Sequence, residues 1–327
     1  MPRLLEVKNL HTGFYTRDGG FVHAVNGVDF TVEQGETLGI VGESGCGKSV
    51  TSLSIMRLIP PRAGRVTQGE IWFQGEDLLQ KNEKEMCSLR GARISMIFQE
   101  PMTSLNPSFT IGFQLMEPIR LHQHCSRAQA RSTAVEMLRL VGIPLPEQRL
   151  REYPHQLSGG MRQRVMIAIA LSSHPDLLIA DEPTTALDVT IQAQILELMK
   201  EASRRLNTST ILITHDMGVV AGMCDRVAVM YAGRIVEYGG LYKVFERPHH
   251  PYTQGLLASI PRLDREAETL HMIPGMVPGP GNMPDGCEFY PRCSRALPIC
   301  RTQKPGVYEA TGQGHTVRCW LYAPKEV

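Results

Sequence analysis

Long hydrophobic runs are missing from this sequence of 327 residues. The longest nearly apolar stretch, residues 165–171, is far shorter than the ~18 residues that a membrane-spanning helix requires. An excess of one charge is also missing, because 34 Lys and Arg residues face 33 Asp and Glu residues, whereas nucleic-acid-binding proteins usually carry a basic excess. The N-terminus has no apolar core of signal-peptide length. We therefore expect a cytosolic protein that binds no nucleic acid and reaches a membrane only through a partner.

Internal repeats, heptad arrays and low-complexity tracts are missing as well. Hydrophobic residues nevertheless make up 42% of the chain, which is enough for a buried core, and the length suits about two domains. Short apolar segments that indicate strands alternate with helical patterns: residues 36–41, 48–58, 94–98, 127–141, 177–180, 190–206 and 210–214. A hairpin is predicted over residues 226–238, with its turn at Ala232-Gly233. This alternation predicts an α/β fold with a mostly parallel sheet covered on both faces.

The composition changes near Pro248. The 80 residues from there to Val327 contain 11 prolines, 8 glycines and half of the eight cysteines. So much proline and glycine disfavours long helices, and a loop-rich segment of this size often needs a staple such as a metal. We therefore predict a first domain over residues 1–247 and a small loop-rich extension over residues 248–327. The alternative is a disordered tail.

The first domain contains a phosphate-binding sequence at the start of the predicted helix 48–58. It follows the pattern G-x-x-x-x-G-K-[ST], directly after a predicted strand, and comprises Gly42, Glu43, Ser44, Gly45, Cys46, Gly47, Lys48 and Ser49. Glycines let backbone N–H groups wrap phosphates, and the helix N-terminus adds a favourable dipole. Lys48 is expected to reach the β- and γ-phosphates, and the Ser49 hydroxyl to ligate Mg²⁺. The alternative is a plain glycine turn.

Two acids end the strand predicted over residues 177–180. Asp181 at the end of such a buried strand can hold Mg²⁺, directly or through water. Glu182 is next in line and can orient or deprotonate an attacking water. Taken alone, an apolar run followed by acids is more often an ordinary strand end. With the phosphate-binding loop upstream, we interpret the pair as the second half of an ATP site.

A third segment, Leu157-Ser158-Gly159-Gly160, precedes a helical run. Ser158 is a typical helix N-cap, and the two glycines expose N–H groups to an anion. A capped helix that binds nothing is the alternative interpretation. In combination, the loop at 42–49, Gln99, this segment, Asp181-Glu182 and His215 resemble the nucleotide-binding subunit of ABC transporters over residues 4 to about 247.

That resemblance implies a P-loop NTPase core of the ABC ATPase type, with a helical subdomain at about residues 100–172. It also implies a head-to-tail dimer in which each ATP lies between one subunit's phosphate-binding loop and Ser158, Gly159 and Gly160 of the other. Gln99 resembles the residue that senses Mg²⁺ and water and links to the permease. His215 resembles the histidine that contacts the γ-phosphate, although a lone strand-end histidine is more often structural.

Three further positions follow from the same resemblance. Asp188 is similar to the acid at the dimer seam. Phe14, with Tyr15 adjacent, is the expected aromatic that stacks on the adenine base, although either ring can instead belong to the core. Cys46 stands where this family often has serine, and a thiol beside a helix N-terminus can have a lowered pKa and be oxidisable.

A closer resemblance, to dipeptide/oligopeptide importer ATPases, rests on residues 98–107 and 250–261. The opening around residues 16–25 resembles the D-type subunit, which usually pairs with a different, F-type ATPase. The resemblance implies two membrane permease subunits, an extracytoplasmic peptide-binding protein, and a place at the cytoplasmic face of the membrane. Residues 102–107 are an expected docking surface. The alternative is a soluble ABC-type ATPase with a metal-bearing sensory or redox tail.

Four cysteines lie within the last 41 residues: Cys287, Cys293, Cys300 and Cys319. Their gaps contain no tight C-x₂-C pair, so the spacing is not that of a usual zinc ribbon, yet four thiolates can hold Zn²⁺ or an iron–sulfur cluster. The segment 286–293 resembles the extension of peptide-importer ATPases, some of which carry a [4Fe–4S] cluster, with Zn²⁺ or free thiols as alternatives. Arg292 and two further arginines are expected to offset the charge of the cluster. His315 is a spare ligand candidate, but a surface position is expected for it.

Overall fold

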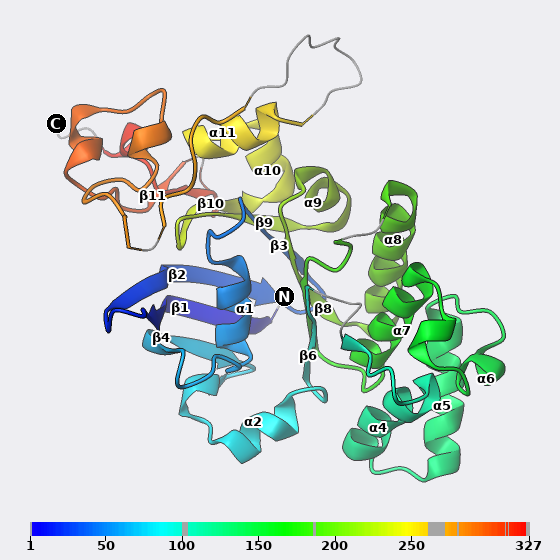
Figure 1. Ribbon diagram of the computed structural model, residues 1–327. Helices are drawn as coiled ribbons and strands as arrows, with labels where there is room; N and C mark the ends of the chain where they lie inside the picture. Colours follow the sequence, from blue (N-terminus) through cyan, green and yellow to red (C-terminus); the bar gives the residue numbers. More distant parts are fainter. Residues whose placement is uncertain are drawn as a thin grey trace. The chain divides into compact units, whose positions relative to one another are not determined.

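The computed structural model in Figure 1 describes residues 2–99, 104–185, 188–260, 272–279, 281–310, 312 and 314–324. Two compact units interleave along the chain. The first unit comprises Met1–Leu4, Val32–Thr37 and Glu76–Ile213, and the second comprises Leu5–Thr31, Leu38–Gly75 and Thr214–Val327. Each unit is described by itself below.

The first unit contains three parallel strands, β6 (Ile94–Ile97), β7 (Leu177–Asp181) and β8 (Ser209–Thr214), in the order β8-β7-β6. Every residue of β7 is buried, as its run of apolar residues predicts. All three strands confirm the sequence-based expectation to within a residue at each end. The strand β7 therefore delivers Asp181 to the carboxyl end of the sheet.

The first unit also contains several helices. They are α2 (Glu83–Leu89), α4 (Ile111–Gln123), α5 (Arg127–Leu140), α6 (Pro146–Arg149), α7 (Gly159–Leu171) and α8 (Val189–Leu206). Shorter elements are the two-residue strand β5 (Glu76–Asp77) and the 3₁₀ turns η1 (Leu78–Gln80) and η2 (Pro154–Gln156). Helices α4, α5 and α7 contact one another. The predicted helices at 127–141 and 190–206 are α5 and α8. Each begins at a side-chain cap, Ser126 for α5 and Asp188 for α8.

An antiparallel sheet in the second unit was not expected from the sequence. Strands β1 (Arg3–Tyr15), β2 (Phe21–Glu33) and β4 (Gly64–Phe73) lie in the order β2-β1-β4, and β1 pairs antiparallel with β4 (Figure 1). Between Leu5 and Lys8 of β1, buried apolar side chains alternate with more exposed charged ones. This period of two is typical of a sheet with one face in the core. The expectation of one mostly parallel sheet is therefore wrong for this part of the chain.

The second unit also carries β3 (Thr37–Val41), β9 (Arg226–Tyr231), β10 (Arg234–Gly240), β12 (Thr316–Val317) and β11 (Tyr308–Glu309). Strand β3 is parallel to β9, and β10 is antiparallel to both β9 and β12. The predicted hairpin is β9–β10. Its turn residues Ala232 and Gly233 both have positive φ, 46° and 81°, as two-residue hairpin turns of the type I′ class require.

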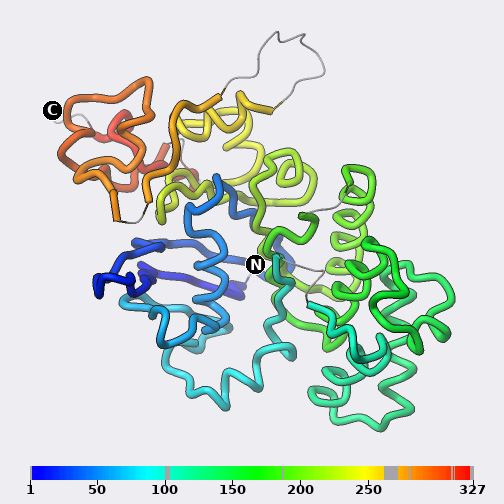
Figure 2. The backbone as a smooth tube through the Cα atoms, in the orientation of Figure 1, coloured from blue at the N-terminus to red at the C-terminus, as the bar shows by residue number. Residues whose placement is uncertain are grey.

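Helix α1 (Lys48–Ile55) follows β3, as predicted, but ends three residues early because Arg57 adopts a left-handed φ of 50°. The unit's other helices are short: α9 (Met217–Met223), α10 (Leu241–Glu246) and α11 (Pro251–Ala258), with the 3₁₀ turns η3 (Tyr290–Arg292), η4 (Pro298–Arg301) and η5 (Trp320–Tyr322). Figure 2 shows the described chain beyond α11 following mostly loops, as its proline and glycine content predicts. In the described residues no helix combines the length and apolar character needed to cross a bilayer.

Candidate functional site

The predicted phosphate-binding loop between β3 and α1 has a backbone that only glycine can follow. Gly42 has φ 154° and Gly47 has φ 103°. A Cβ added at Gly42 would lie 2.1 Å from the carbonyl oxygen of Met230, and one at Gly47 would lie 2.5 Å from that of Ala24. Any side chain at either position would therefore displace the loop from the β9–β10 hairpin behind it.

Lys48 lies at the first position of α1, directly after the loop. Its Nζ donates to the carbonyl oxygens of Gly42 at 2.8 Å and Glu43 at 3.1 Å, and its side chain is buried. These two hydrogen bonds fix the ammonium group of Lys48 at the first two residues of the loop. Ser49 is the next residue, in the first turn of α1. Backbone N–H groups, a helix N-terminus and one buried ammonium group together form the donor set that a triphosphate requires.

The structure corrects the expectation for Cys46. Its thiol is completely buried, and burial raises its pKa, although Lys48 nearby acts in the opposite direction. The position beside a helix N-terminus therefore does not favour a reactive thiolate, because the loss of hydration disfavours the charged form more than the attraction of Lys48 favours it. A small, inert residue is the interpretation that the geometry supports.

The acids after β7 are held in a defined arrangement in the first unit. Asp181 is buried at the end of the strand, and Glu182 follows in a left-handed conformation with φ 47°. The Gln99 Nε2 donates to Glu182 Oε2 at 3.2 Å, and the Thr185 hydroxyl donates to the same oxygen at 3.0 Å. The structure thus brings together the predicted Gln99 and Glu182, which lie beyond the carboxyl ends of the neighbouring parallel strands β6 and β7. A left-handed glutamate is an uncommon conformation that often marks a functional position.

Ser158 caps helix α7, since its hydroxyl accepts from the N–H of Met161 at 3.3 Å. Gly159 is exposed, and a Cβ added there would meet no atom within 4 Å. The predicted cap of this helix is therefore present, and the exposure of its N–H groups to an anion stays a prediction. Farther along the same helix, the buried side chain of Gln163 donates to the carbonyl oxygen of Pro183. This contact ties the segment to the residues after Glu182, a role that the sequence did not reveal.

The remaining predicted nucleotide contacts occupy less constrained positions. His215 is exposed directly after β8, where Asp216 caps α9. Asp188 caps α8, so its carboxylate has a structural partner, the N–H of Ile191 at 3.0 Å. Phe14 is half-buried, whereas Tyr15 is 47% exposed and packs edge-on against Phe21. Contact of any of these side chains with ATP stays a prediction.

The four cysteines of the extension are partly or fully buried. Burial, together with repulsion from the thiolates of Cys300 and Cys319, raises the pKa of Cys287 to about 12. Burial also raises the pKa of Cys319, with Cys293 and Cys300 as further contributors. The four thiols are therefore close enough to influence one another electrostatically.

No group of three or more His, Cys, Asp or Glu side chains in the described part of the chain is arranged to hold a metal ion. Tetrahedral zinc with Zn–S bonds of 2.3 Å needs its four sulfurs about 3.8 Å apart. The described residues thus show neither a zinc site nor an iron–sulfur site.

His315 is not the surface residue that we expected. It is completely buried, and its Nε2 lies 2.9 Å from Oε1 of Glu237, which is itself buried. Glu237 also accepts from the N–H groups of His249 at 2.8 Å and His250 at 2.9 Å. The ring of His315 is thus committed to a carboxylate network that joins β10, the start of α11 and β12, and is not a spare metal ligand.

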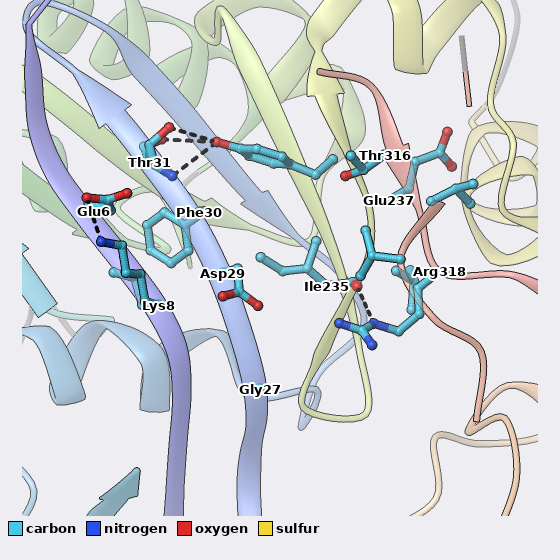
Figure 3. A pocket seen from close by; sticks show the side chains of 15 residues that line it. Glu6, Lys8, Gly27, Asp29, Phe30, Thr31, Ile235, Glu237, Thr316 and Arg318 are labelled. Atoms are coloured by element: carbon cyan, nitrogen blue, oxygen red, sulfur yellow. Dashed lines mark hydrogen bonds and ion pairs between the residues drawn. The ribbon is translucent and has the colours of Figure 1, made fainter. Parts of the chain in front are cut away.

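A pocket of ≈ 330 Å³ lies in the second unit, apart from the nucleotide motifs. Figure 3 shows residues of β1 and β2, such as Lys8 and Asp29, across from residues of β10 and of β12 and its continuation, such as Ile235 and Arg318. None of its 15 lining residues belongs to the predicted ATP site. The pocket therefore gives no support to an additional phosphate contact.

Comparison with known proteins agrees with this geometry. A family described as ABC transporter matches residues 25–185, and one described as oligopeptide/dipeptide transporter, C-terminal region, matches residues 236–300. The Bacillus subtilis dipeptide transport ATP-binding protein DppD is 56% identical over 98% of this chain and 95% of its own length. The Salmonella typhimurium oligopeptide transport ATP-binding protein OppD is 52% identical over 97% and 93%.

Solved structures agree as well. The dimeric ATP-binding cassette MJ0796 bound to ADP and Pi matches with a TM-score of 0.64 and 28% identity, covering 72% of this chain and 98% of its own. The cassette cbiO1 from Clostridium perfringens matches with a TM-score of 0.65 and 28% identity, covering 76% of this chain and 92% of its own. The alternative of a soluble ATPase with a sensory tail gains no support from these matches. The chain belongs to the ABC transporter ATPases, in the branch that carries the oligopeptide/dipeptide transporter C-terminal region.

Proposed function

We propose that this ABC ATPase powers the import of dipeptides or oligopeptides as one half of a head-to-tail dimer with two ATP molecules at the interface. The observation that carries the proposal is the phosphate-binding loop, which is already folded around the position of Lys48. Relatives at 52–56% identity over nearly the whole chain are named dipeptide or oligopeptide transport ATP-binding proteins, which supports the substrate class. Family membership implies a dimer of ATPases and permease partners.

In the proposed site, the loop from Gly42 to Ser49 binds the phosphates and Lys48 turns from its carbonyl partners to the β- and γ-phosphates. Ser49, Asp181 and Gln99 hold Mg²⁺, which neutralises the charge on the phosphates. Glu182 accepts a proton from the attacking water. The two hydrogen bonds that its carboxylate accepts support this assignment, because they fix the orientation of the carboxylate.

The remaining residues act on the nucleotide from two directions. His215 contacts the γ-phosphate, and Phe14 or Tyr15 stacks on adenine. Ser158 and its two following glycines contact the ATP of the partner subunit, with Asp188 at the seam. The exposed N-terminus of α7 supports this arrangement, because a Cβ added at Gly159 would meet no atom within 4 Å and the helix N-terminus therefore has room for an anion.

The proposed partners are an F-type ATPase chain, two membrane permease subunits and, indirectly, an extracytoplasmic peptide-binding protein. The chain is then a peripheral protein at the cytoplasmic face of the membrane. Of the proposed docking segment 102–107, Met102 and Thr103 lie outside the described residues. Residues 1–247 form the proposed ATP-binding domain, with its helical subdomain at about 100–172, and residues 248–327 form the extension.

The extension is proposed to hold a [4Fe–4S] cluster on Cys287, Cys293, Cys300 and Cys319. The burial of the four thiols and their electrostatic influence on one another support a shared site. The resemblance of segment 286–293 to the extension of peptide-importer ATPases favours a cluster over Zn²⁺. Iron content after anaerobic purification tests it: about four irons and four sulfides per chain are expected, and both should fall in Cys287→Ser. Cys224→Ser, at a buried cysteine outside the four, is the matched control. About one zinc per chain, or no metal, would contradict the cluster.

Transport itself is tested in proteoliposomes that contain this chain, its partner ATPase, both permeases and the binding protein. ATP-dependent uptake of labelled dipeptides and tetrapeptides is expected, and it should be lost in Lys48→Ala. Hydrolysis of ATP without uptake of either peptide would leave the ATPase assignment in place and overturn peptide import.

A further inference from the structure

A buried arginine of the extension holds the second residue of the phosphate-binding loop. Arg292, in η3, donates from Nη1 to Oε2 of Glu43 at 2.8 Å and from Nη2 to Oε1 at 3.0 Å. This is the bidentate geometry in which a guanidinium group and a carboxylate bind most strongly. The two residues are 249 positions apart and belong to the same unit, so their pair is a tertiary link between the extension and the loop.

The extension fixes the guanidinium group independently of the loop. Arg292 Nε donates to the carbonyl oxygen of Pro274 at 2.8 Å, and its Nη2 lies 3.4 Å from that of Ile273. The side chain of Arg292 is 6% exposed, whereas that of Glu43 is 30% exposed. A cation this deeply buried depends on its anionic partner, because unpaired burial of a charge is costly. The pair therefore opposes any movement of Glu43 away from the extension.

The backbone of Glu43 is also held by a residue from the region beyond residue 247. Its N–H donates to the hydroxyl of Tyr252 at 2.9 Å, and Tyr252 is completely buried at the start of α11. The ring of Tyr252 packs edge-on against Tyr231 at 4.7 Å, and Phe289 of the extension contacts both rings at 5.5 and 5.2 Å. Two residues from the region beyond residue 247 thus fix both the side chain and the N–H of one loop residue.

We propose that Arg292 is a positioning residue for ATP binding, which acts through Glu43 to keep the loop in its phosphate-binding conformation. The loop contains three glycines with positive φ, so without external contacts it would sample other conformations. The conformational entropy lost when ATP orders the loop would then weaken ATP binding. The contact with Arg292 removes part of that cost in advance. ATP affinity then depends on a folded extension. Cys293, one of the proposed cluster ligands, is the residue directly after Arg292.

The test measures the affinity of the full chain for a fluorescent ATP analogue, and KM and kcat of ATP hydrolysis in the assembled transporter. Arg292→Ala is expected to weaken binding roughly tenfold, as loss of a charge-assisted pair predicts, and to raise KM with little change in kcat. Arg292→Lys should recover part of the affinity, because lysine keeps the positive charge. The recovery should be incomplete, because lysine cannot form the bidentate pair with Glu43. Arg301→Ala, at an exposed arginine of the same extension, is the matched control and should bind ATP normally.

A double-mutant cycle separates positioning from general stabilisation. If Arg292 acts through Glu43, then Arg292→Ala combined with Glu43→Gln should bind ATP no more weakly than the weaker-binding single variant. Fully additive losses, or wild-type affinity in a folded Arg292→Ala chain, would overturn the proposal. Should Arg292→Ala fail to fold, Arg292→Lys and Glu43→Gln decide the question, because both roughly preserve volume: unchanged affinity in both rejects the positioning role.

Discussion

The side-chain amide of Gln99 donates a hydrogen bond to the carboxylate of Glu182 at 3.2 Å, between the ends of two adjacent parallel strands. The two residues are 83 positions apart in the chain. The bond places a neutral donor, the Gln99 amide, against the carboxylate of Glu182, which we propose as the general base for the attacking water. If Gln99 senses the permease and Glu182 is the base, as we propose, a movement of Gln99 would reach that carboxylate directly, through this one hydrogen bond.

Replacement of the base gives the first prediction. Glu182→Gln should lower kcat for ATP hydrolysis in the assembled transporter by about 10²–10⁴, the usual range for loss of a general base, while ATP stays bound. Hydrolysis and retained nucleotide are measured on the same preparation. Thr185→Val is the matched control, because it removes one hydrogen bond to the carboxylate but leaves the carboxylate itself, and its kcat should fall far less. Wild-type turnover in Glu182→Gln would exclude Glu182 as the base.

The second prediction concerns Cys46, whose burial raises the pKa of its thiol. Alkylation by iodoacetamide at neutral pH requires an accessible thiolate, so Cys46 should react much more slowly than the exposed Cys87. Mass spectrometry of the labelled native chain measures both rates. Equal labelling of the two residues in the folded protein would show that the loop opens far more readily than its packing indicates.

The sequence predicted those features in which local pattern and function coincide. Strands β3, β6, β7 and β8 are apolar runs with clear ends. The glycines of the phosphate-binding loop were predictable because the loop needs them at positions with positive φ. The antiparallel sheet escaped prediction because the alternation in β1 is interrupted: Leu4 and Leu5 are both buried, and Lys8 and Asn9 are both exposed. Arg292 escaped because its partner is 249 residues away, and position in the chain suggested only the neighbouring cysteines. Contacts of this kind are set by tertiary packing, which leaves no local signal.

The buried Glu237–His315 pair gives the third prediction. Both side chains are completely removed from solvent, and the carboxylate of Glu237 accepts a hydrogen bond from Nε2 of His315 at 2.9 Å. His315→Ala leaves a buried carboxylate with one partner fewer and should lower the free energy of unfolding by about 2–4 kcal/mol. Urea unfolding of the full chain measures it. His315→Gln is the control, since its amide can still donate to Glu237 and should recover part of the loss. Equal stability of all three chains would mean that the network contributes nothing.

Acid sensitivity is the fourth prediction, and it follows from His250. Burial lowers the pKa of this histidine from 6.5 to about 4, although the neighbouring Glu237 acts in the opposite direction. Between those two values the unfolded chain binds a proton that the folded chain does not, so stability falls as the pH drops below about 6.5. Each pKa unit corresponds to about 1.4 kcal/mol, which sets an upper limit of about 3 kcal/mol for this residue.

The variant that isolates this effect is His250→Asn. The Nδ1 of His250 accepts from the N–H of Tyr252 at 3.1 Å and so caps α11, and an asparagine oxygen can accept the same bond without titrating. We expect the stability of the variant to decline less steeply than that of the wild type between pH 7 and pH 5, in urea unfolding at each pH. The pKa of Glu237 is also lowered, as its hydrogen bonds to His315 and to the backbone outweigh burial, so both chains keep some acid sensitivity. Parallel declines would assign all of the acid sensitivity to groups other than His250.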